Sequence, residues 1–250
     1  MSGHSKWHSI RHKKGAADAK RGKIFTRHAN LITIAAREGG GDPDMNPNLR
    51  LAIDNAKKDN VPNDNIDRAI KRGTGEGKDA AEISEELYEG YGPCGVAVMV
   101  EALTDNKNRT YTNIRTAFNK NGGNLGNSGS VAWMFDRKGV IQIHTEGKNR
   151  EELELAAIDA GAEDLEREDG VMTIYTHPSQ LTQATDALKK AGFEPEQVET
   201  LMVPNNTIKV ENEADAQKVM DFIEALEEDM DVNNVSANFD ISDEMMEKLA

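Results

Sequence analysis

The sequence predicts an α+β protein with a helical first part and two further units of mixed strand and helix. Residues 16–73 carry apolar side chains at helical spacing and no strand-like run. From residue 96 onward, short β-branched runs alternate with short amphipathic segments that end at glycine. Between these parts, residues 73–78 are rich in glycine and mark a change in charge balance, which indicates a linker.

The first part contains three predicted helices. The first spans residues 16–37, where apolar side chains form one broad stripe and the cations occupy the other side. Residues 39–41, all glycine, end this helix. The second helix begins after Asn46, a predicted N-cap that precedes Pro47. A third, short helix starts near residue 61. Residues 1–15 show no apolar periodicity and are predicted to form an arm that is flexible or that orders on binding.

The second part alternates strands and helices. Strands are predicted at 96–103, 130–135, 140–144, 171–176, 197–203 and 235–239, and helices at 109–119, 151–160, 179–191 and 215–228. This order fits two β-α-β-β-α-β-like units. We expect a first domain of residues 1–78, a second of residues 79–136 plus 199–250, and a third of residues 137–198 inserted into the second. Two consecutive domains are the alternative arrangement.

The composition excludes several classes of protein. The chain is 37% hydrophobic and holds no run near the roughly 18 apolar residues of a membrane helix, so no membrane partner is expected. No apolar stretch follows the basic N-terminus, which argues against a secretory signal. A mitochondrial transit peptide is a weaker alternative, because a predicted folded helix follows directly. Cys94 is the single cysteine, which excludes intrachain disulfides and cysteine-based zinc sites and fits a cytoplasmic location.

Charge separation is the strongest functional signal in the sequence. Residues 1–37 hold nine lysines and arginines against one acid, a formal +8, whereas the whole chain carries −14. Residues 79–250 carry −21. A cationic end on an acidic protein indicates a polyanionic partner, because lysine and arginine neutralise phosphates and release their counterions. Trp7 lies among these cations, where its indole could stack on a base.

We therefore predict a nucleic-acid-binding surface on the arm and first helix. Its candidate residues are Lys6, Trp7, His8, Arg11, His12, Lys13, Lys14, Lys20, Arg21, Lys23 and Arg27. The polyanion is DNA or ribosomal RNA, and no clear helix-turn-helix or aromatic-rich RNA-binding strand decides between them. The acidic half is expected to face away from it and to offer a surface to protein partners. A pure interaction scaffold, with the acidic half as its active surface, is a further class.

No catalytic residue, metal site or cofactor is predicted. Residues 73–78 have the spacing G-x-x-x-G-K, and Asp79 stands where a phosphate-binding loop has serine or threonine. His4, His8 and His12 recur every four residues, as metal ligands on a helix would, but the surrounding cations would repel a dication. Residues 121–129, rich in glycine, could offer backbone amides to an anion or form a hairpin-like connection. An enzyme is not expected.

Five segments resemble the YebC/PmpR family, and the resemblance covers essentially the whole chain. They are residues 2–7 (SGHSKW), 19–26 (AKRGKIFT), 39–43 (GGGDP), 88–93 (YEGYGP) and 122–126 (GGNLG). The resemblance implies a helical N-terminal domain, two ferredoxin-like α+β domains, and a cytoplasmic DNA-binding transcriptional regulator without established catalytic residues. Some relatives act in translation, so a translation factor associated with the ribosome and its RNA is the alternative. Cys94 departs from the family, where small residues, often glycine, are usual.

Overall fold

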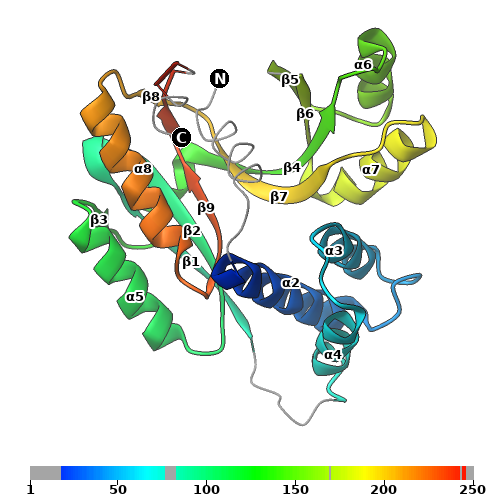
Figure 1. Ribbon diagram of the computed structural model, residues 1–250, viewed down its shortest axis with the longest axis horizontal. Coiled ribbons are helices and arrows are strands. Elements are labelled where there is room, and N and C mark those ends of the chain that lie inside the picture. The colour runs from blue at the N-terminus through cyan, green and yellow to red at the C-terminus, as the bar shows by residue number, and fades with distance from the viewer. Residues whose placement is uncertain (1–17, 77–82, 169, 243, 246–250) are drawn as a thin grey trace.

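A computed structural model describes residues 18–76, 83–168, 170–242, 244 and 245. It has three parts: a group of helices and two four-stranded sheets, each sheet with its own helices (Figure 1). The α+β class with a helical first part is confirmed. Residues 1–17 and 77–82, which include the whole predicted arm and the end of the predicted linker, lie outside the described residues.

The helical part consists of α2 (Asp18–Gly39), α3 (Pro47–Lys58) and α4 (Asn63–Gly73). Their apolar faces meet in one core, which includes Ile32, Leu49 and Ile66. Asn46 caps α3 as predicted: its Oδ1 accepts a hydrogen bond from the backbone N–H of Leu49 at 3.1 Å. Its Nδ2 donates to the carbonyls of residues 35 and 40 at the end of α2, so one side chain fixes both helix ends.

The first sheet has the strand order β3-β1-β2-β9. Its strands are β1 (Ser84–Tyr91), β2 (Ala97–Thr104), β3 (Asn124–Leu125) and β9 (Val232–Ala237). Helices α5 (Lys107–Lys120) and α8 (Glu213–Glu227) cover one face, where Phe118 and Phe222 meet edge to face at 4.9 Å. On the opposite face, Ala97 and Met99 are covered by Val131 and Phe135.

The second sheet has the order β5-β6-β4-β7, and its strand pairs are antiparallel. Its elements are β4 (Phe135–His144), α6 (Arg150–Asp159), β5 (Asp164–Glu168), β6 (Val171–Thr176), α7 (Leu181–Lys190) and β7 (Gln197–Pro204). This chain order is β-α-β-β-α-β, and the sheet order is that of a ferredoxin-like unit. Figure 1 shows α6 and α7 together on one face of this sheet, with Ile141, Leu153 and Leu188 in the core between them.

Smaller elements complete the chain. Strands β8 (Ile208–Lys209) and β10 (Phe239–Asp240) form a short parallel pair. Single turns of 3-10 helix lie at η1 (Pro93–Gly95), η2 (Ala132–Met134) and η3 (Pro178–Gln180). Cys94 lies in η1 with φ +60°, the left-handed region that favours glycine. This backbone conformation accounts for the glycine that is often found at this position in the family that the chain resembles.

The structure corrects the prediction in three places. Strand β1 was missed, because its carboxylates hide the strand pattern. Residues 130–135 are not a strand of the first sheet: η2 occupies 132–134, and Phe135 already pairs with Pro204 in the second sheet. Residues 199–204 therefore belong to the second sheet and not to the first. The reason is the long antiparallel pairing of β4 with β7. It joins Phe135–Gln142 of β4 to Gln197–Pro204 of β7. The first sheet is accordingly β-β-α-β followed, after the second sheet, by α-β, and not a β-α-β-β-α-β unit.

Candidate nucleic-acid interface and the central cleft

The candidate cations lie on the arm and on the first half of α2. Lys6, Trp7, His8, Arg11, His12, Lys13 and Lys14 lie outside the described residues. Lys20, Arg21, Lys23 and Arg27 fall within α2. Since an α-helix turns by 100° per residue, positions 20, 23 and 27 share one face, and position 21 lies about a quarter turn away. Arg21 is exposed and Lys23 is half-buried.

Helix α2 is held from two sides. Its residues Ile32 and Ala36 pack into the core of the helical part, and its residue Ile34 packs against Ile83 and Leu103 of the first sheet unit. The guanidinium of Arg37 also donates to the carbonyl of Ile83 at 2.7 Å. The second half of α2 is therefore fixed. In its first half, Phe25 also packs against the helical core, and the start of the helix lies beside the first sheet (Figure 1).

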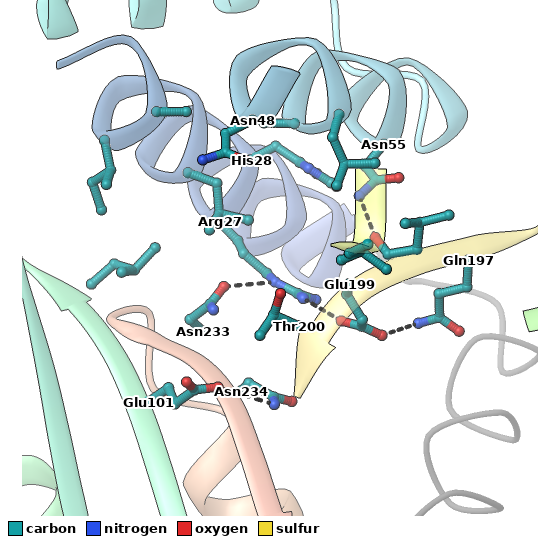
Figure 2. Close-up of a pocket in the computed structure, with 18 of the residues that line it drawn as sticks. Arg27, His28, Asn48, Asn55, Glu101, Gln197, Glu199, Thr200, Asn233 and Asn234 are labelled. Carbon is teal, nitrogen blue, oxygen red and sulfur yellow. Dashed lines mark hydrogen bonds and ion pairs between the residues drawn. The ribbon is translucent and has the colours of Figure 1, made fainter. Parts of the chain in front are cut away.

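Arg27 points into the molecule and joins all three parts. Its Nε donates to Oδ1 of Asn233 in β9 at 2.9 Å, and its Nη2 lies 3.3 Å from Oε2 of Glu199 in β7 (Figure 2). The side chains of Arg27 and Glu199 are 19% and 16% exposed. Glu199 also accepts from Gln197 at 2.6 Å. Arg27 is thus bound by side chains of both sheets, Asn233 of the first and Glu199 of the second.

A cleft of about 910 Å³ lies where the three parts meet. Its walls come from α2, α3, β1, β2, β4, β7 and β9. Carboxylates outnumber the lysines and arginines of this lining. The acids are Glu38, Asp59, Glu85, Glu86, Glu101, Glu196 and Glu199, and the cations are Arg27, Lys58 and Arg137. Low-dielectric walls concentrate the field of such a lining, so the cleft disfavours phosphate groups.

Glu101 lies in this cleft on β2. Burial raises the pKa of its carboxyl, and a hydrogen bond from Nδ2 of Asn234 at 3.3 Å and the charge of Arg137 offset only part of that effect. Glu199 and Glu85 raise it further by like-charge repulsion. The electrostatics of this wall therefore favour proton uptake and cations, the opposite of what a phosphate-binding surface requires.

Contacts from α3 set the distance between the helical part and the second sheet. Asn55 Nδ2 donates to the carbonyl of Val198 at 2.8 Å, and Lys58 Nζ donates to the carbonyl of Pro195 at 2.8 Å. Burial lowers the pKa of Lys58, and nearby Lys189 lowers it further. Together with Arg27, these bonds join α2 and α3 to β7 and to the residues just before it.

Apart from Arg27, sequence reasoning missed the residues that line this cleft. Glu101, Glu199 and Asn233 come from strands far apart in the chain, and no motif connects them. In the part of the chain that the structure describes, no group of histidine, cysteine, aspartate or glutamate side chains could hold a metal ion. His4, His8 and His12 lie outside that part. Among the described helices, none is long and apolar enough to cross a membrane.

Fold and site together define a class of three-part α+β proteins, with cations on the arm and first helix and carboxylates in a central cleft. A family model described as the TACO1/YebC protein N-terminal domain matches residues 5–76. A second, described as the TACO1/YebC second and third domain, matches residues 83–239. The chain belongs to the TACO1/YebC family, which confirms the resemblance carried by the five sequence segments.

Relatives match the chain over its full length. A protein of Halothermothrix orenii is 50% identical over 251 aligned positions, which cover 100% of this chain and 99% of the relative. One of Geotalea uraniireducens is 51% identical, with 100% of both chains covered. Both are named probable transcriptional regulatory protein. The crystal structure of a conserved hypothetical protein from Aquifex aeolicus is similar with a TM-score of 0.84 and 46% identity, covering 90% of this chain and 93% of that one.

Proposed function

We propose that this protein is a nucleic-acid-binding regulator of gene expression, in the first place a DNA-binding transcriptional regulator. The arm and the start of α2 would hold the phosphates. The observation that carries the proposal is the concentration of +8 in residues 1–37 of a chain with a total of −14. The names of the relatives, probable transcriptional regulatory protein, support a regulatory role.

The lining of the cleft argues against the cleft side of α2 as the contact surface. Carboxylates line the cleft, so a polyanion that approaches from that side meets repulsion. Arg27 faces the cleft and is held by Glu199 and Asn233, whereas Arg21 is exposed. Arg27 then contributes mainly by orienting α2, and positions 20 and 23 share its face of the helix. The arm together with Arg21 would provide the main phosphate contacts, with Lys20 and Lys23 at their edge.

The remaining assignments follow from this proposal. The protein acts without catalysis and without a cofactor, in the cytoplasm and away from membranes. Its acidic body limits nonspecific coating of nucleic acid and offers a surface to protein partners. The names of the relatives describe regulation and no reaction.

Salt dependence of binding tests the proposal. The full-length protein is titrated against duplex DNA and against structured RNA at salt concentrations between about 50 and 300 mM. A protein that neutralises Z phosphates shows a slope of log K against log salt of about −0.9Z on duplex DNA. Replacing Arg11, Lys13 and Lys14 by glutamine should flatten this slope by about two to three units.

A matched control has the same change of net charge on the body. Arg150, Lys190 and Lys209 are exposed cations outside the arm, and their replacement by glutamine should leave the slope nearly unchanged. Equal effects of the two triple variants would show that the arm is not the main contact. A slope near zero for the unmodified protein on both polymers would overturn the proposal itself.

Ribosomal RNA is the alternative polyanion, because phosphate contacts alone do not distinguish DNA from RNA. Crosslinking in cells decides between them. Recovery of chromosomal DNA with the protein supports transcriptional regulation. Recovery of ribosomal RNA alone would instead assign the protein to translation, as a factor associated with the ribosome.

A further inference from the structure

We propose that the exposed rings of Tyr91 and Trp133 form a stacking platform for unpaired bases of a single-stranded nucleic acid. This inference rests on the proposed nucleic-acid-binding function and adds to it a second contact, separate from the basic arm. The arm would supply affinity for phosphates in general. The platform would select strands whose bases are free to stack.

The polar atoms of the two aromatic side chains converge on one backbone carbonyl. Tyr91 ends β1, and Trp133 lies in η2, more than forty residues later. The hydroxyl of Tyr91 donates to the carbonyl oxygen of Ser130 at 3.4 Å, and the indole N–H of Trp133 donates to the same oxygen at 3.3 Å. Trp133 is nevertheless 66% exposed and Tyr91 is 38% exposed. Their polar atoms are engaged while much of each ring remains in contact with solvent.

A buried carboxylate fixes the loop that carries Trp133. Glu89, on the same strand as Tyr91, is 3% exposed and accepts three backbone hydrogen bonds. The donors are the N–H groups of Gly129, Val131 and Ala132, at 2.8, 2.9 and 2.8 Å. A loop held by three charge-assisted bonds is ordered before any ligand arrives, so little entropy is lost when a base stacks on it.

Core packing explains why Trp133 faces outward. Its neighbours Val131 and Phe135 are buried against Ala97 and Met99 on the face of the first sheet that α5 and α8 leave free. Val131 and Phe135 thus provide the buried apolar contacts between this loop and the sheet. Trp133 lies between them and does not belong to the buried core. The exposed indole and the partly exposed ring of Tyr91 are the aromatic surface that the proposed platform uses.

The segment of chain that leads to Trp133 is free of carboxylates, whereas Glu89 beneath the loop is buried. Residues 106–135 contain no aspartate or glutamate, although the protein has 44 of them. This segment holds Lys107, Arg109, Arg115 and Lys120. Lys107 and Arg109 are paired with acids, but Arg115 and Lys120 are exposed and form no ion pair with any residue that the structure describes. The segment therefore offers a polyanion the least repulsion within an acidic body.

The glycine-rich loop after α5 brings its backbone and asparagine amides to the same sheet edge. A Cβ on Gly123 would lie 2.8 Å from the carbonyl oxygen of Tyr91, so this loop passes directly beside the tyrosine. Asn124 pairs with Tyr91 in the sheet, and Lys120 ends the preceding helix. Amide side chains bond base edges, and a lysine contacts phosphate. The bases of a duplex are stacked on each other, so the rings fit a single strand better than a duplex.

The fluorescence of Trp133 provides a direct test. The chain has two tryptophans, so the variant Trp7→Phe leaves Trp133 as the single emitter. A twelve-residue oligouridylate or oligothymidylate should quench this emission in a saturable way, whereas a duplex of the same length should quench it far less. In the full-length protein, Trp133→Ala should weaken binding of the single strand about tenfold and change duplex binding less than about twofold.

Controls separate stacking from general effects. Trp133→Phe keeps a ring and should retain most of the affinity, and Leu155→Ala removes an exposed apolar side chain, 62% exposed, from the other sheet unit. Constant Trp133 emission, with duplex binding that depends on the arm, would overturn the platform and leave the proposed function intact. Failure of the unmodified protein to bind either polymer would overturn both. Loss of a protein partner on Trp133→Ala, without loss of single-strand affinity, would assign the surface to that protein and also overturn the platform.

Discussion

The guanidinium of Arg27 lies 3.3 Å from the carboxylate of Glu199, so a residue of the first helix is bound to a strand of the second sheet 172 positions later. Both side chains are less than one fifth exposed. This contact decides what Arg27 does: it positions α2 relative to the sheets, and the phosphate-binding role predicted for it then requires the ion pair to open.

Arg27→Gln should therefore lower stability more than it changes nucleic-acid binding. The variant leaves Glu199 without its guanidinium partner at a largely buried position, which costs about 1–3 kcal/mol in the free energy of unfolding. Urea denaturation measures this loss. The slope of log K against log salt should change less than for Lys13→Gln. A slope reduced by a full unit with unchanged stability would place Arg27 on the phosphates instead.

Glu89→Gln should destabilise the protein and loosen the loop before Trp133. The amide has one oxygen to accept hydrogen bonds where the carboxylate has two, and the charge that strengthens all three bonds is lost. We expect a loss of about 1.5–3 kcal/mol. Amide hydrogen exchange at Gly129, Val131 and Ala132 should accelerate more than exchange in β6, which makes no contact with Glu89.

The pH dependence of stability follows from the same bonds. Burial alone would raise the pKa of Glu89, but the three backbone donors outweigh it, and the pKa is lowered below the ordinary glutamate value of 4.5. The stabilisation is therefore fully present above about pH 4.5 and is lost as pH falls through the lower pKa of the folded state. The difference in stability between the unmodified protein and Glu89→Gln should shrink as pH falls below 4.5. A constant difference would contradict this account.

Glu101→Gln should have the opposite effect. Burial raises the pKa of Glu101, so its ionised form is a cost to the folded state that appears as pH rises through that pKa. Glutamine retains an acceptor for Asn234 and removes the charge. The variant should be more stable than the unmodified protein at pH 7 and equal to it at a pH where Glu101 is protonated. Thermal melting of the variant and of the unmodified protein at these two pH values measures both differences in stability.

Two glycines of the helical part should respond to alanine with opposite signs. A Cβ on Gly73 would lie 2.4 Å from the carbonyl oxygen of Thr33 and 2.7 Å from Cβ of Ala36, so Gly73→Ala forces α4 away from α2. We expect a loss of about 1–3 kcal/mol. A Cβ on Gly22 meets nothing within 4 Å, and Gly22→Ala should stabilise α2 by about 0.5–1 kcal/mol. Chemical denaturation of both variants checks the pair.

Asp231 provides the strongest polar link between α5 and the turn before β9. It accepts from Nη2 of Arg109 at 2.7 Å and from the hydroxyl of Thr110 at 2.7 Å, and its side chain is 13% exposed. Asp231→Asn should cost about 1.5–3 kcal/mol. The control is Lys107→Ala, which breaks an ion pair with a 64% exposed lysine and should cost less than about 1 kcal/mol. Similar losses for the two variants would contradict the assigned importance of Asp231.

Helices were predicted better than strands, for physical reasons visible in particular residues. Asn46 and the apolar spacing of α3 act within a few positions, so the sequence pattern contains both the cap and the buried face. In β1, alternate residues face different surroundings: Tyr88 packs into the core beneath α5 and α8, and Glu89 is buried by a loop forty residues later. No local sequence pattern indicates that a carboxylate such as Glu89 is buried, so β1 could not be predicted from the sequence.

The candidate site was predicted unevenly in the same way. The cations of α2 follow from composition and helical spacing. The partners of Arg27 come from β7 and β9, and the rings of Tyr91 and Trp133 meet on the carbonyl of Ser130. Each of these contacts depends on strand pairing between segments that are distant in the chain.

By itself, the sequence determined the separation of a cationic end from an acidic body, the helical character of the first part and the α+β class of the rest. These properties depend on composition and on the spacing of apolar residues within short segments, so they can be read without knowing which distant segments meet. Only the tertiary structure decided which strands pair, where the sheets divide at residues 135 and 204, and that carboxylates line the cleft between the three parts. It also turned Arg27 inward and left Trp133 exposed, because those outcomes depend on hydrogen bonds and packing between segments that only folding brings together.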